Sequence, residues 1–434
     1  MRNSPLSRLV TIAVLAITLG IFPQAWGQYT ETTIHNFTGG NDGARPISGL
    51  TFDPQGNLYG TTLVGGPYDW GTVFRLAPQV GGGWSETVLF DFSDGTDGGY
   101  PLGGLIIDGQ GNLYGTTIYG GSNSCFALLG TTCGVVFKLS PQAHGRWKET
   151  VIHAFQNNAR DGFLPECTLV FDSAGNLYGT TGDGGAYNLG VVFELTPTTS
   201  GPWKEKILHS FTGGPDGRTP YTALVVDQAG NLYGTAPGGG NVNTAACTSY
   251  GCGVVFKLTP TGSGLWNEHV LYSFTNTTDG AYPTSGLTVD AAGNLYGTAG
   301  GGNSAKGVVF ELSKGSGGLW TEKVLYNFQG GNDGIEPFAN IIFDAAGNLY
   351  GTTYAGGIST VCAPNCGTVF ELSPTSGGNW TESILYTFTG GADGCTPQGG
   401  LVEDSAGNFY STVPANASGC VNGAESGAVF ELTP

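Results

Sequence analysis

Polar and apolar side chains alternate along short stretches of the chain, and turns separate these stretches. One unit shows the pattern clearly, because residues 287–289, 294–298, 307–312 and 320–328 each read as a strand with a period of two residues. The Asp-Ala-Ala-Gly sequence at 290–293 suits a type I turn closed by a left-handed glycine, a common hairpin connection. After residue 27, no stretch sustains a helical period. Each unit is therefore predicted to be a four-stranded antiparallel sheet.

This unit recurs along the whole chain. The hexapeptide Gly-Asn-Leu-Tyr-Gly-Thr, or its variant in the last copy, begins at Gly56, Gly111, Gly175, Gly230, Gly293, Gly347 and Gly407. Three further motifs recur in the same register: G-x-V-F-[EKR]-L, an aromatic-x-Glu before an alternating run, and Asp-Gly-x-x-Pro. Four independent motifs agree on seven repeats, which is the signature of a repeat architecture.

Repeated four-stranded sheets form either a closed ring of blades or an open stack. The chain carries an outer-strand motif at residues 29–37, before the first complete unit, while the last unit reaches Pro434 without one. In a ring the N-terminal strand completes the last sheet, whereas an open solenoid leaves two exposed edges. We expect an all-β fold, a seven-bladed β-propeller of four-stranded antiparallel blades over residues 28–434. It is closed by the N-terminal strand, which completes the last blade.

Residues 1–27 have the features of a secretory signal peptide. Two arginines precede an apolar run over residues 9–22, and Ala25-Trp26-Gly27 places small residues at −3 and −1 of a cleavage point before Gln28. A membrane anchor is the alternative, but the run is shorter than the ~20 residues of a spanning helix. We expect a secreted or periplasmic protein, cleaved near Gly27, with no membrane insertion.

The charge balance excludes two classes of partner. The chain has 15 Lys+Arg against 33 Asp+Glu, a formal net charge of −18. Nucleic-acid affinity comes mainly from basic side chains on phosphates, and anionic lipids also attract basic segments. We therefore expect no nucleic-acid partner. We expect a monomer whose ligand is a glycan or a protein.

Three pairs of cysteines lie close together, each just before a G-V-V-F or G-T-V-F segment. They are Cys125/Cys133, Cys247/Cys252 and Cys362/Cys366. Their spacings, with no histidine nearby, fit zinc ligation poorly and fit local disulfides in an oxidising compartment. Cys395 and Cys420 fall in two loops of the last unit, where a fourth bridge is plausible, and Cys167 is expected to be a buried odd thiol.

The repeated unit resembles a known family. The sequence G-L-x-x-D-x-x-G-N-L-Y-G-T-T…G-x-V-F-x-L-x-P…W-x-E-x-x-L-Y-x-F…D-G-x-x-P resembles the GloVer-type tandem repeat of bacterial surface and secreted proteins described as choice-of-anchor. The resemblance covers residues 28–434. It implies a secreted, propeller-like protein and carries no established activity, so it supplies no catalytic residue.

Most residues that suggest chemistry belong to the repeat itself. The turn aspartates, the Asp-Gly aspartates and the W-x-E glutamates recur in every unit, so we interpret them as structural. His35, His153 and His209 occupy a place that Phe or Tyr holds in other units, so we expect them to pack as rings. No nucleophile triad, H-E-x-x-H motif or phosphate-binding loop occurs. We expect no catalytic residue, no metal and no cofactor.

Function is expected where the units differ. In a propeller, the Asp-Gly-x-x-Pro crossings and the loops between second and third strands emerge on one face, around the central channel. The residues on both sides of the seven prolines are expected to surround its mouth. Before the prolines they are Arg45, Tyr100, Leu164, Thr219, Tyr282, Glu336 and Thr396, and after them Ile47, Leu102, Glu166, Tyr221, Thr284, Phe338 and Gln398. Across the crossings we select as the candidate binding set Arg45, Tyr100, Glu166, Tyr221, Tyr282 and Glu336.

Three functions remain open from the sequence. The favoured one is a secreted binding or scaffold propeller without catalysis, because aromatic rings with few charges suit sugar faces or protein hot spots. The alternative is an extracytoplasmic polysaccharide-acting enzyme of the glycoside hydrolase or lyase type. Its two carboxylates would be Glu166 and Glu336, whose positions three units apart disfavour a retaining geometry. A structural envelope protein is the third.

Overall fold

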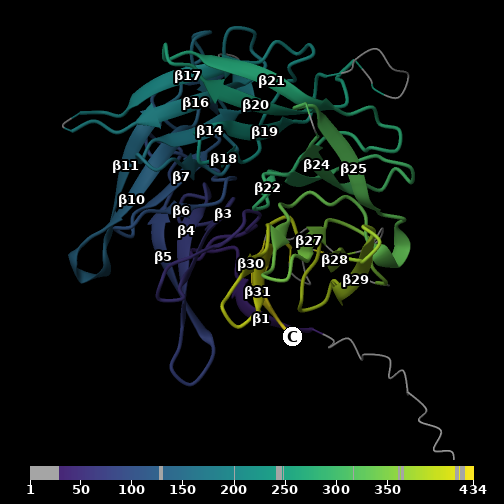
Figure 1. Ribbon diagram of the computed structural model, residues 1–434. Helices are drawn as coiled ribbons and strands as arrows, with labels where there is room; N and C mark the ends of the chain where they lie inside the picture. The colour runs from purple at the N-terminus through teal and green to yellow at the C-terminus, as the bar shows by residue number, and fades with distance from the viewer. Residues whose placement is uncertain are drawn as a thin grey trace, which may run out of the picture.

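The computed structural model describes residues 29–434 except 127–130, 200, 241–246, 248, 316, 360–361, 363–365, 416–419 and 421–425. Seven four-stranded antiparallel sheets follow one another around a centre, which confirms the predicted seven-bladed β-propeller (Figure 1). The predicted signal peptide, residues 1–27, lies outside the described residues. None of the helices in the described part of the chain is long and apolar enough to cross a membrane.

Each blade runs from a short inner strand to a long outer strand. In the order of blades 1 to 7, the inner strands are β2 (Thr51–Phe52), β6 (Ile106–Ile107), β13 (Val170–Phe171), β18 (Val225–Val226), β22 (Thr288–Val289), β26 (Ile342–Phe343) and β30 (Val402–Glu403). The second strands are β3 (Leu58–Thr62), β7 (Leu113–Thr117), β14 (Leu177–Thr181), β19 (Leu232–Ala236), β23 (Leu295–Ala299), β27 (Leu349–Thr353) and β31 (Phe409–Val413). The second strands are buried along their whole length, since blades cover both of their faces.

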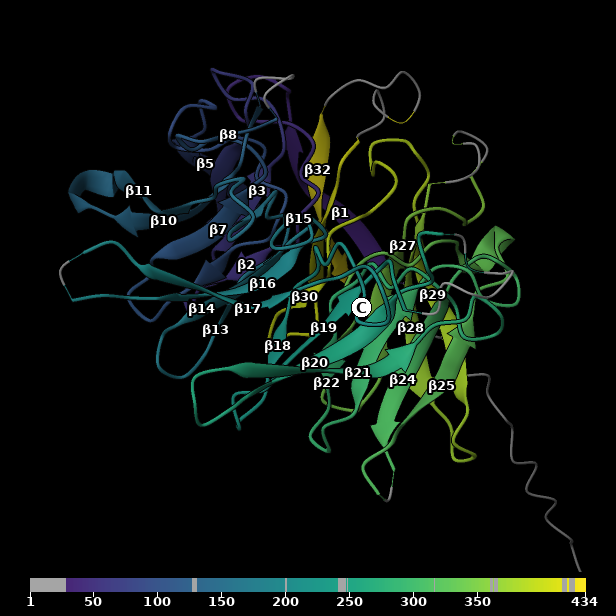
Figure 2. The ribbon, with the colours of Figure 1, turned by 90° about the horizontal axis from the view of Figure 1, so that it is seen from above.

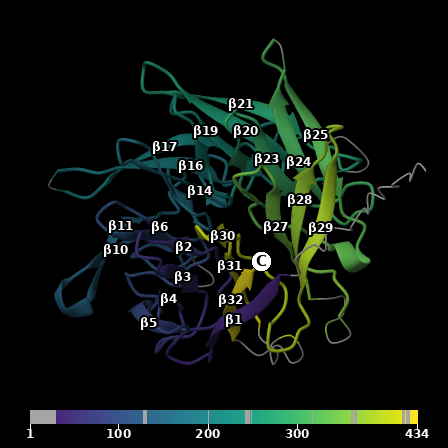
Figure 3. The same ribbon diagram turned by 60° about the horizontal axis from the view of Figure 1, so that its bottom comes forward.

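The two remaining strands of each blade are longer. The third strands are β4 (Thr72–Pro78), β10 (Val135–Pro141), β16 (Val191–Thr196), β20 (Val254–Pro260), β24 (Val308–Lys314), β28 (Thr368–Pro374) and β32 (Gly427–Thr433). The outer strands are β5 (Trp84–Asp91), β11 (Trp147–Ala154), β17 (Lys204–Ser210), β21 (Trp266–Ser273), β25 (Trp320–Asn327), β29 (Trp380–Thr387) and β1 (Thr30–Phe37). Strand β1 pairs antiparallel with β32, so the N-terminal strand closes blade 7 as predicted (Figures 2 and 3).

Short elements occur outside the blades. They are the strands β8 (Ser124–Phe126), β9 (Thr131–Thr132), β12 (Gly162–Phe163) and β15 (Asp183–Gly184), and the 3₁₀ turns η1 (Ala143–Gly145) and η2 (Gly331–Asp333).

A half-buried aspartate organises the hairpin between inner and second strands. In blade 1, Oδ1 of Asp53 accepts hydrogen bonds from the backbone N–H groups of Gln55 and Asn57, while Oδ2 accepts from the Asn57 amide and the Tyr59 hydroxyl. Burial alone would raise the pKa of Asp53, but these hydrogen bonds outweigh it and lower the pKa. The same network recurs in all seven blades, which explains the repeated D-x-x-G-N-L-Y sequence.

Phenylalanine pairs hold neighbouring blades together. Phe155 follows the outer strand of blade 2 and packs edge to face on Phe193 in the third strand of blade 3, with ring centroids 5.3 Å apart. Equivalent pairs join every blade to the next, at centroid distances of 5.0 to 5.3 Å. The two phenylalanines of each unit therefore form an apolar contact that recurs between all neighbouring blades.

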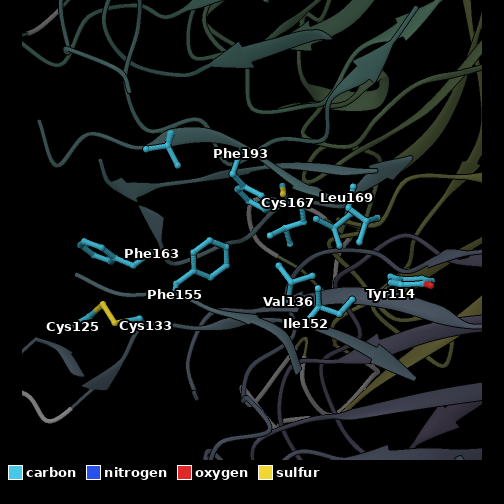
Figure 4. Close-up of a cluster of buried hydrophobic side chains, with 13 residues drawn as sticks. Tyr114, Cys125, Cys133, Val136, Ile152, Phe155, Phe163, Cys167, Leu169 and Phe193 are labelled. Carbon is cyan, nitrogen blue, oxygen red and sulfur yellow. A yellow bond between two sulfur atoms is a disulfide. The ribbon is translucent and has the colours of Figure 1, made fainter. Parts of the chain in front are cut away.

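The predicted cysteine pairing is confirmed. Disulfides join Cys125–Cys133, Cys247–Cys252, Cys362–Cys366 and Cys395–Cys420. Cys167 is the free cysteine, buried near Leu169 and Phe193 in a cluster that also contains the first disulfide (Figure 4).

Candidate functional site

The crossings between blades and the loops between second and third strands lie on one face of the ring, as predicted. In each blade the crossing pairs with that blade's own loop, for example through the bridges Gly99↔Tyr119 and Ile335↔Ala355. In blade 3 this pairing extends into the two-stranded sheet of β12 and β15. The two variable loop classes therefore form one continuous surface around the channel.

The residue before each crossing proline links two blades through its backbone. Its φ is positive in all seven crossings, with values from 51° to 58°. In the second crossing, the N–H of Tyr100 donates to the Trp70 carbonyl of blade 1, and the Tyr100 carbonyl accepts from Ile118 of blade 2. A left-handed conformation is strained for a residue other than glycine. In all seven crossings the N–H of this residue donates to the preceding blade, and in four of them (Arg45, Tyr100, Leu164 and Glu336) its carbonyl also accepts from the following blade.

A cavity of about 560 Å³ lies at the centre of the ring. Of the residues predicted at the mouth, those directly before the prolines do not line the cavity, whereas the residue directly after every crossing proline does: Ile47, Leu102, Glu166, Tyr221, Thr284, Phe338 and Gln398. The cavity therefore draws one variable residue from each of the seven blades.

Small residues two positions further along keep the cavity open. They are Gly49, Gly104, Thr168, Ala223, Gly286, Asn340 and Gly400, which also line the cavity. The two larger members use their side chains to bind the neighbouring inner segment: Thr168 Oγ1 accepts from the Gly104 N–H and Asn340 Oδ1 from the Gly286 N–H. The intervening residues are buried, and the Ser48 and Thr222 hydroxyls bond Thr61 and Thr235 of their own blades, although both residues also border the cavity.

One carboxyl group gives the cavity its charge. Among the lining residues, all of which belong to the described part of the chain, Glu166 is the one acid, and no Lys, Arg or His is present. Burial, and secondarily the nearby Asp183 carboxylate, raise the pKa of Glu166 to about 7. Burial is also the main reason that the pKa of Tyr221 is raised. The cavity is thus a nearly neutral chamber with polar, aliphatic and aromatic walls.

The structure divides the predicted binding set into two groups. Glu166 and Tyr221 line the cavity, whereas the residues that precede the prolines do not. These residues are Arg45, Tyr100, Tyr282 and Glu336. Tyr100 packs against Trp70 and Tyr119, with ring centroids 4.6 and 5.7 Å away, and Tyr282 lies 6.3 Å from Tyr250. The tyrosines before the prolines are therefore part of the rim, in contact with loop aromatics.

Sequence reasoning placed Phe338 and Gln398 at the mouth but left them out of the binding set. The signal that identifies them is the alternation after the proline, which puts alternate residues on the channel side.

Arg218, in the crossing before blade 4, was not among the predicted residues. Its guanidinium lies 4.8 Å from the Tyr250 ring centroid, and its charge opposes the burial that raises the pKa of Asp183.

The histidines take the packing role that the sequence predicted. His153 and His209 lie edge to face on Phe155 and Phe211, with centroids 4.7 Å apart in both pairs. Each also contacts the aspartate of the following crossing, at 3.1 Å from Asp161 and 3.2 Å from Asp216. In blades 4 to 6 the corresponding tyrosine donates its hydroxyl to that aspartate.

Comparisons with known proteins identify the repeat. A family model described as the Gloeobacter/Verrucomicrobia repeat matches residues 21–248 and 242–434. A solved structure from Thermus thermophilus, assigned as an oxidoreductase (glucose dehydrogenase), is similar at 16% identity and a TM-score of 0.43. The alignment covers 75% of this chain and 94% of that chain. No protein with a curated description matches the chain.

Proposed function

The chain belongs to the Gloeobacter/Verrucomicrobia repeat family, and from that premise we propose that it is a binding propeller that holds a neutral glycan in its central cavity. The observation that carries the proposal is the composition of the cavity wall, which combines aromatic residues with neutral hydrogen-bonding groups and a single carboxyl. Family membership supports the repeat scaffold and leaves the ligand to be argued from the site.

The cavity chemistry favours a neutral carbohydrate over a charged one. Tyr221 and Phe338 offer ring surfaces of the kind that pack on the apolar face of a sugar. Thr284 and Gln398 offer neutral hydrogen-bonding groups. Because no basic side chain lines the cavity, a uronate or sulfate group would enter without a counter-charge, beside Glu166.

We further propose that the protein works outside the cytoplasm. Four disulfides in one chain are typical of an oxidising compartment. Amino-terminal sequencing of the protein exported from its native host tests this proposal. A mature amino terminus at Gln28 would support it, and retention of the whole chain in the cytoplasm would refute it.

A polysaccharide-acting enzyme is the second candidate, and Glu166 is the observation in its favour. A carboxyl group with a pKa near 7 is suited to donate a proton at neutral pH. Hydrolysis by the usual route needs a second carboxylate, about 5 Å away for retention or 6.5–9.5 Å for inversion. The predicted partner, Glu336, does not line the cavity, so binding is the better-supported function.

The test uses the purified chain and a panel of neutral hexasaccharides, namely cello-, malto-, xylo- and mannohexaose, with polygalacturonate as the charged comparison. Calorimetry should show binding of a neutral member that Phe338→Ala and Glu166→Gln weaken. The matched control Glu336→Gln, outside the cavity, should leave the affinity unchanged. New reducing ends after prolonged incubation would favour the enzyme, and a preference for polygalacturonate would refute a neutral ligand.

A further inference from the structure

Three side chains of metal-ligating type meet at the interface between blades 2 and 3. His153 comes from β11, Asp161 from the crossing that follows it, and Glu205 from the outer strand of blade 3. The Nε2 atom of His153 lies 3.1 Å from Asp161 Oδ2 and 3.5 Å from Glu205 Oε1. One potential ligand atom from each residue lies within 4.8 Å of the other two.

Two oxygens of this cluster have no hydrogen-bond partner. Asp161 is 4% exposed, and its Oδ1 atom is buried and unpaired. Glu205 Oε1 is buried and unpaired as well, a feature that it shares with the corresponding glutamates of other blades, Glu268 among them. Among the described residues, His153 is the one basic side chain within ion-pair distance of either carboxyl group. A buried carboxyl oxygen without a hydrogen-bond partner is unfavourable, so two of them beside an imidazole call for a further partner.

The next interface shows that these residue types alone do not create the cluster. His209, Asp216 and Glu268 occupy the equivalent positions between blades 3 and 4. There the Thr212 hydroxyl donates to Asp216 Oδ1 and the Thr212 N–H donates to Oδ2. Both oxygens of Asp216 are therefore engaged, and no set of three ligand atoms forms among the described residues of that interface.

A glutamine after the terminal phenylalanine accounts for the unpaired Oδ1, since Gln329 leaves Asp333 Oδ1 unpaired in the same way in a crossing of ordinary length. The crossing after blade 2 also carries one extra residue. The aspartate stands five residues after the terminal phenylalanine in six crossings, but Asp161 stands six residues after Phe155. The residue after Phe155 is Gln156, so the hydroxyl that caps Asp216 is replaced by a longer amide. Gln156 donates only its backbone N–H to Asp161 Oδ2, which leaves Oδ1 unpaired.

We propose that His153, Asp161 and Glu205 bind one divalent transition-metal ion, with Zn²⁺ as the best match. Tetrahedral ligands at 2.0–2.1 Å from Zn²⁺ lie about 3.3 Å apart, and the two distances at His153 Nε2 bracket that value. An imidazole nitrogen selects against Ca²⁺ and Mg²⁺, which take oxygen ligands. The His153 and Glu205 side chains are 15% and 19% exposed, so water has access to a fourth position.

The proposed ion would join blades 2 and 3 at the one crossing that carries an additional residue. Bound through Asp161 Oδ2 and Glu205 Oε1, it would give the unpaired Glu205 Oε1 a partner and offset the repulsion between the two carboxyl groups. The site is independent of the central cavity, because none of its three residues lines that cavity.

The test measures the binding of Zn²⁺ to the purified full chain by calorimetry. The absorption spectrum of added Co²⁺ is a second probe of the same site. The wild type should bind one ion, and Zn²⁺ should raise its melting temperature. Glu205→Gln and His153→Phe should each weaken the affinity for Zn²⁺ by about 10-fold or more. His153→Phe is a mild change for folding, because Phe90 holds that place in blade 1. A cooperative melt of each variant without metal checks that it folds.

The matched controls are Glu268→Gln and His209→Phe, which make the same changes one interface further on and should leave Zn²⁺ binding intact. Millimolar Ca²⁺ should produce no shift in the melting temperature. Absence of one-to-one binding by the wild type would overturn the proposal. Equal losses in the variants of the two interfaces would overturn it too.

Discussion

Thr30 and Thr433 are cross-strand partners in blade 7, although 403 residues separate them along the chain. The pairing continues to Phe37 and Gly427, so strand β1 covers the edge of β32 along its length. Phe37 then packs on Phe74 of blade 1, with ring centroids 5.0 Å apart. One strand therefore supplies both the last sheet and its contact with the first blade.

Deletion of residues 29–37 should open the ring. The deletion exposes the edge of β32 and removes the aromatic partner of Phe74, which leaves both an unpaired strand and an apolar surface. We expect loss of cooperative unfolding and a lower yield of soluble protein, measured by calorimetry and gel filtration. A cooperative transition at the wild-type temperature would show that β1 is dispensable.

Features that repeat in all seven units could be predicted from the sequence, whereas features of single positions mostly could not. Seven copies of four motifs were enough for the blade number, the closure and the local disulfides. The cavity wall was predicted only in part, because residues before and after each proline vary equally while only Glu166, Tyr221 and their equivalents face the channel. The positive φ of Tyr100 and Glu336 is not visible in the sequence. The cluster around Asp161 depends on Gln156 in place of a hydroxyl residue, and the effect of this replacement on hydrogen bonding appears only in three dimensions.

Acidic pH should stabilise the protein. Burial, followed by the neighbouring carboxylates Asp42 and Asp91, raises the pKa of Glu86 from 4.5 to about 7. The pKa values of the corresponding glutamates of the six other blades shift in the same direction for the same main reason. A group whose pKa is higher in the folded state stabilises the fold while protonated, and this contribution is lost as pH rises from about 4.5 to 7.

The turn aspartates work in the opposite direction at lower pH. The pKa values of these aspartates are lowered in the folded protein, as in Asp53, from the ordinary value of 3.8. They therefore stabilise the fold above about pH 3.8, and this contribution is lost as the pH falls below that value. The melting temperature should therefore peak between about pH 4 and pH 5 and fall toward pH 8. Glu322→Gln should flatten the fall, and Glu336→Gln, at an exposed position, should not. A melting temperature that rises from pH 5 to pH 8 would contradict this assignment.

Gly190→Ala should destabilise the fold much more than Gly175→Ala in the same blade. Both glycines have positive φ, at 95° and 84°, which costs alanine about 1–2 kcal/mol. A Cβ on Gly175 meets nothing within 4 Å, whereas a Cβ on Gly190 would lie 2.4 Å from the Thr181 carbonyl oxygen and 2.6 Å from Pro220 Cδ. In denaturant unfolding, we expect Gly190→Ala to lower the free energy of unfolding by about 1–3 kcal/mol more than Gly175→Ala does. Equal losses in the two variants would show that Pro220 does not pack against this glycine.

Thiol titration should find one reactive cysteine per chain, and only after denaturation. Eight cysteines are paired, and Cys167 is buried, with the Thr180 N–H directed at its sulfur at 3.1 Å. Burial raises the pKa of the Cys167 thiol, so little thiolate is present at neutral pH. Reaction with Ellman's reagent should be negligible in the native protein and stoichiometric in guanidinium chloride. A Cys167→Ser control should abolish it, and more than one thiol in the denatured wild type would contradict the pairing.

Gly400→Leu should block the central cavity without weakening the fold. Gly400 lines the cavity, its φ is not positive, and a Cβ there would lie 3.6 Å from its nearest neighbours, an ordinary contact distance. The rest of the leucine side chain would then project into the space that we assign to the ligand. Binding of neutral hexasaccharides in calorimetry should be lost while the melting temperature stays near the wild-type value.

Gly109→Leu is the matched control, because Gly109 lies in the exposed turn before β7 and a Cβ there meets nothing within 4 Å. Should Gly400→Leu bind as tightly as the wild type, the ligand would have to lie on the rim around Tyr100 and Tyr282 and not in the cavity.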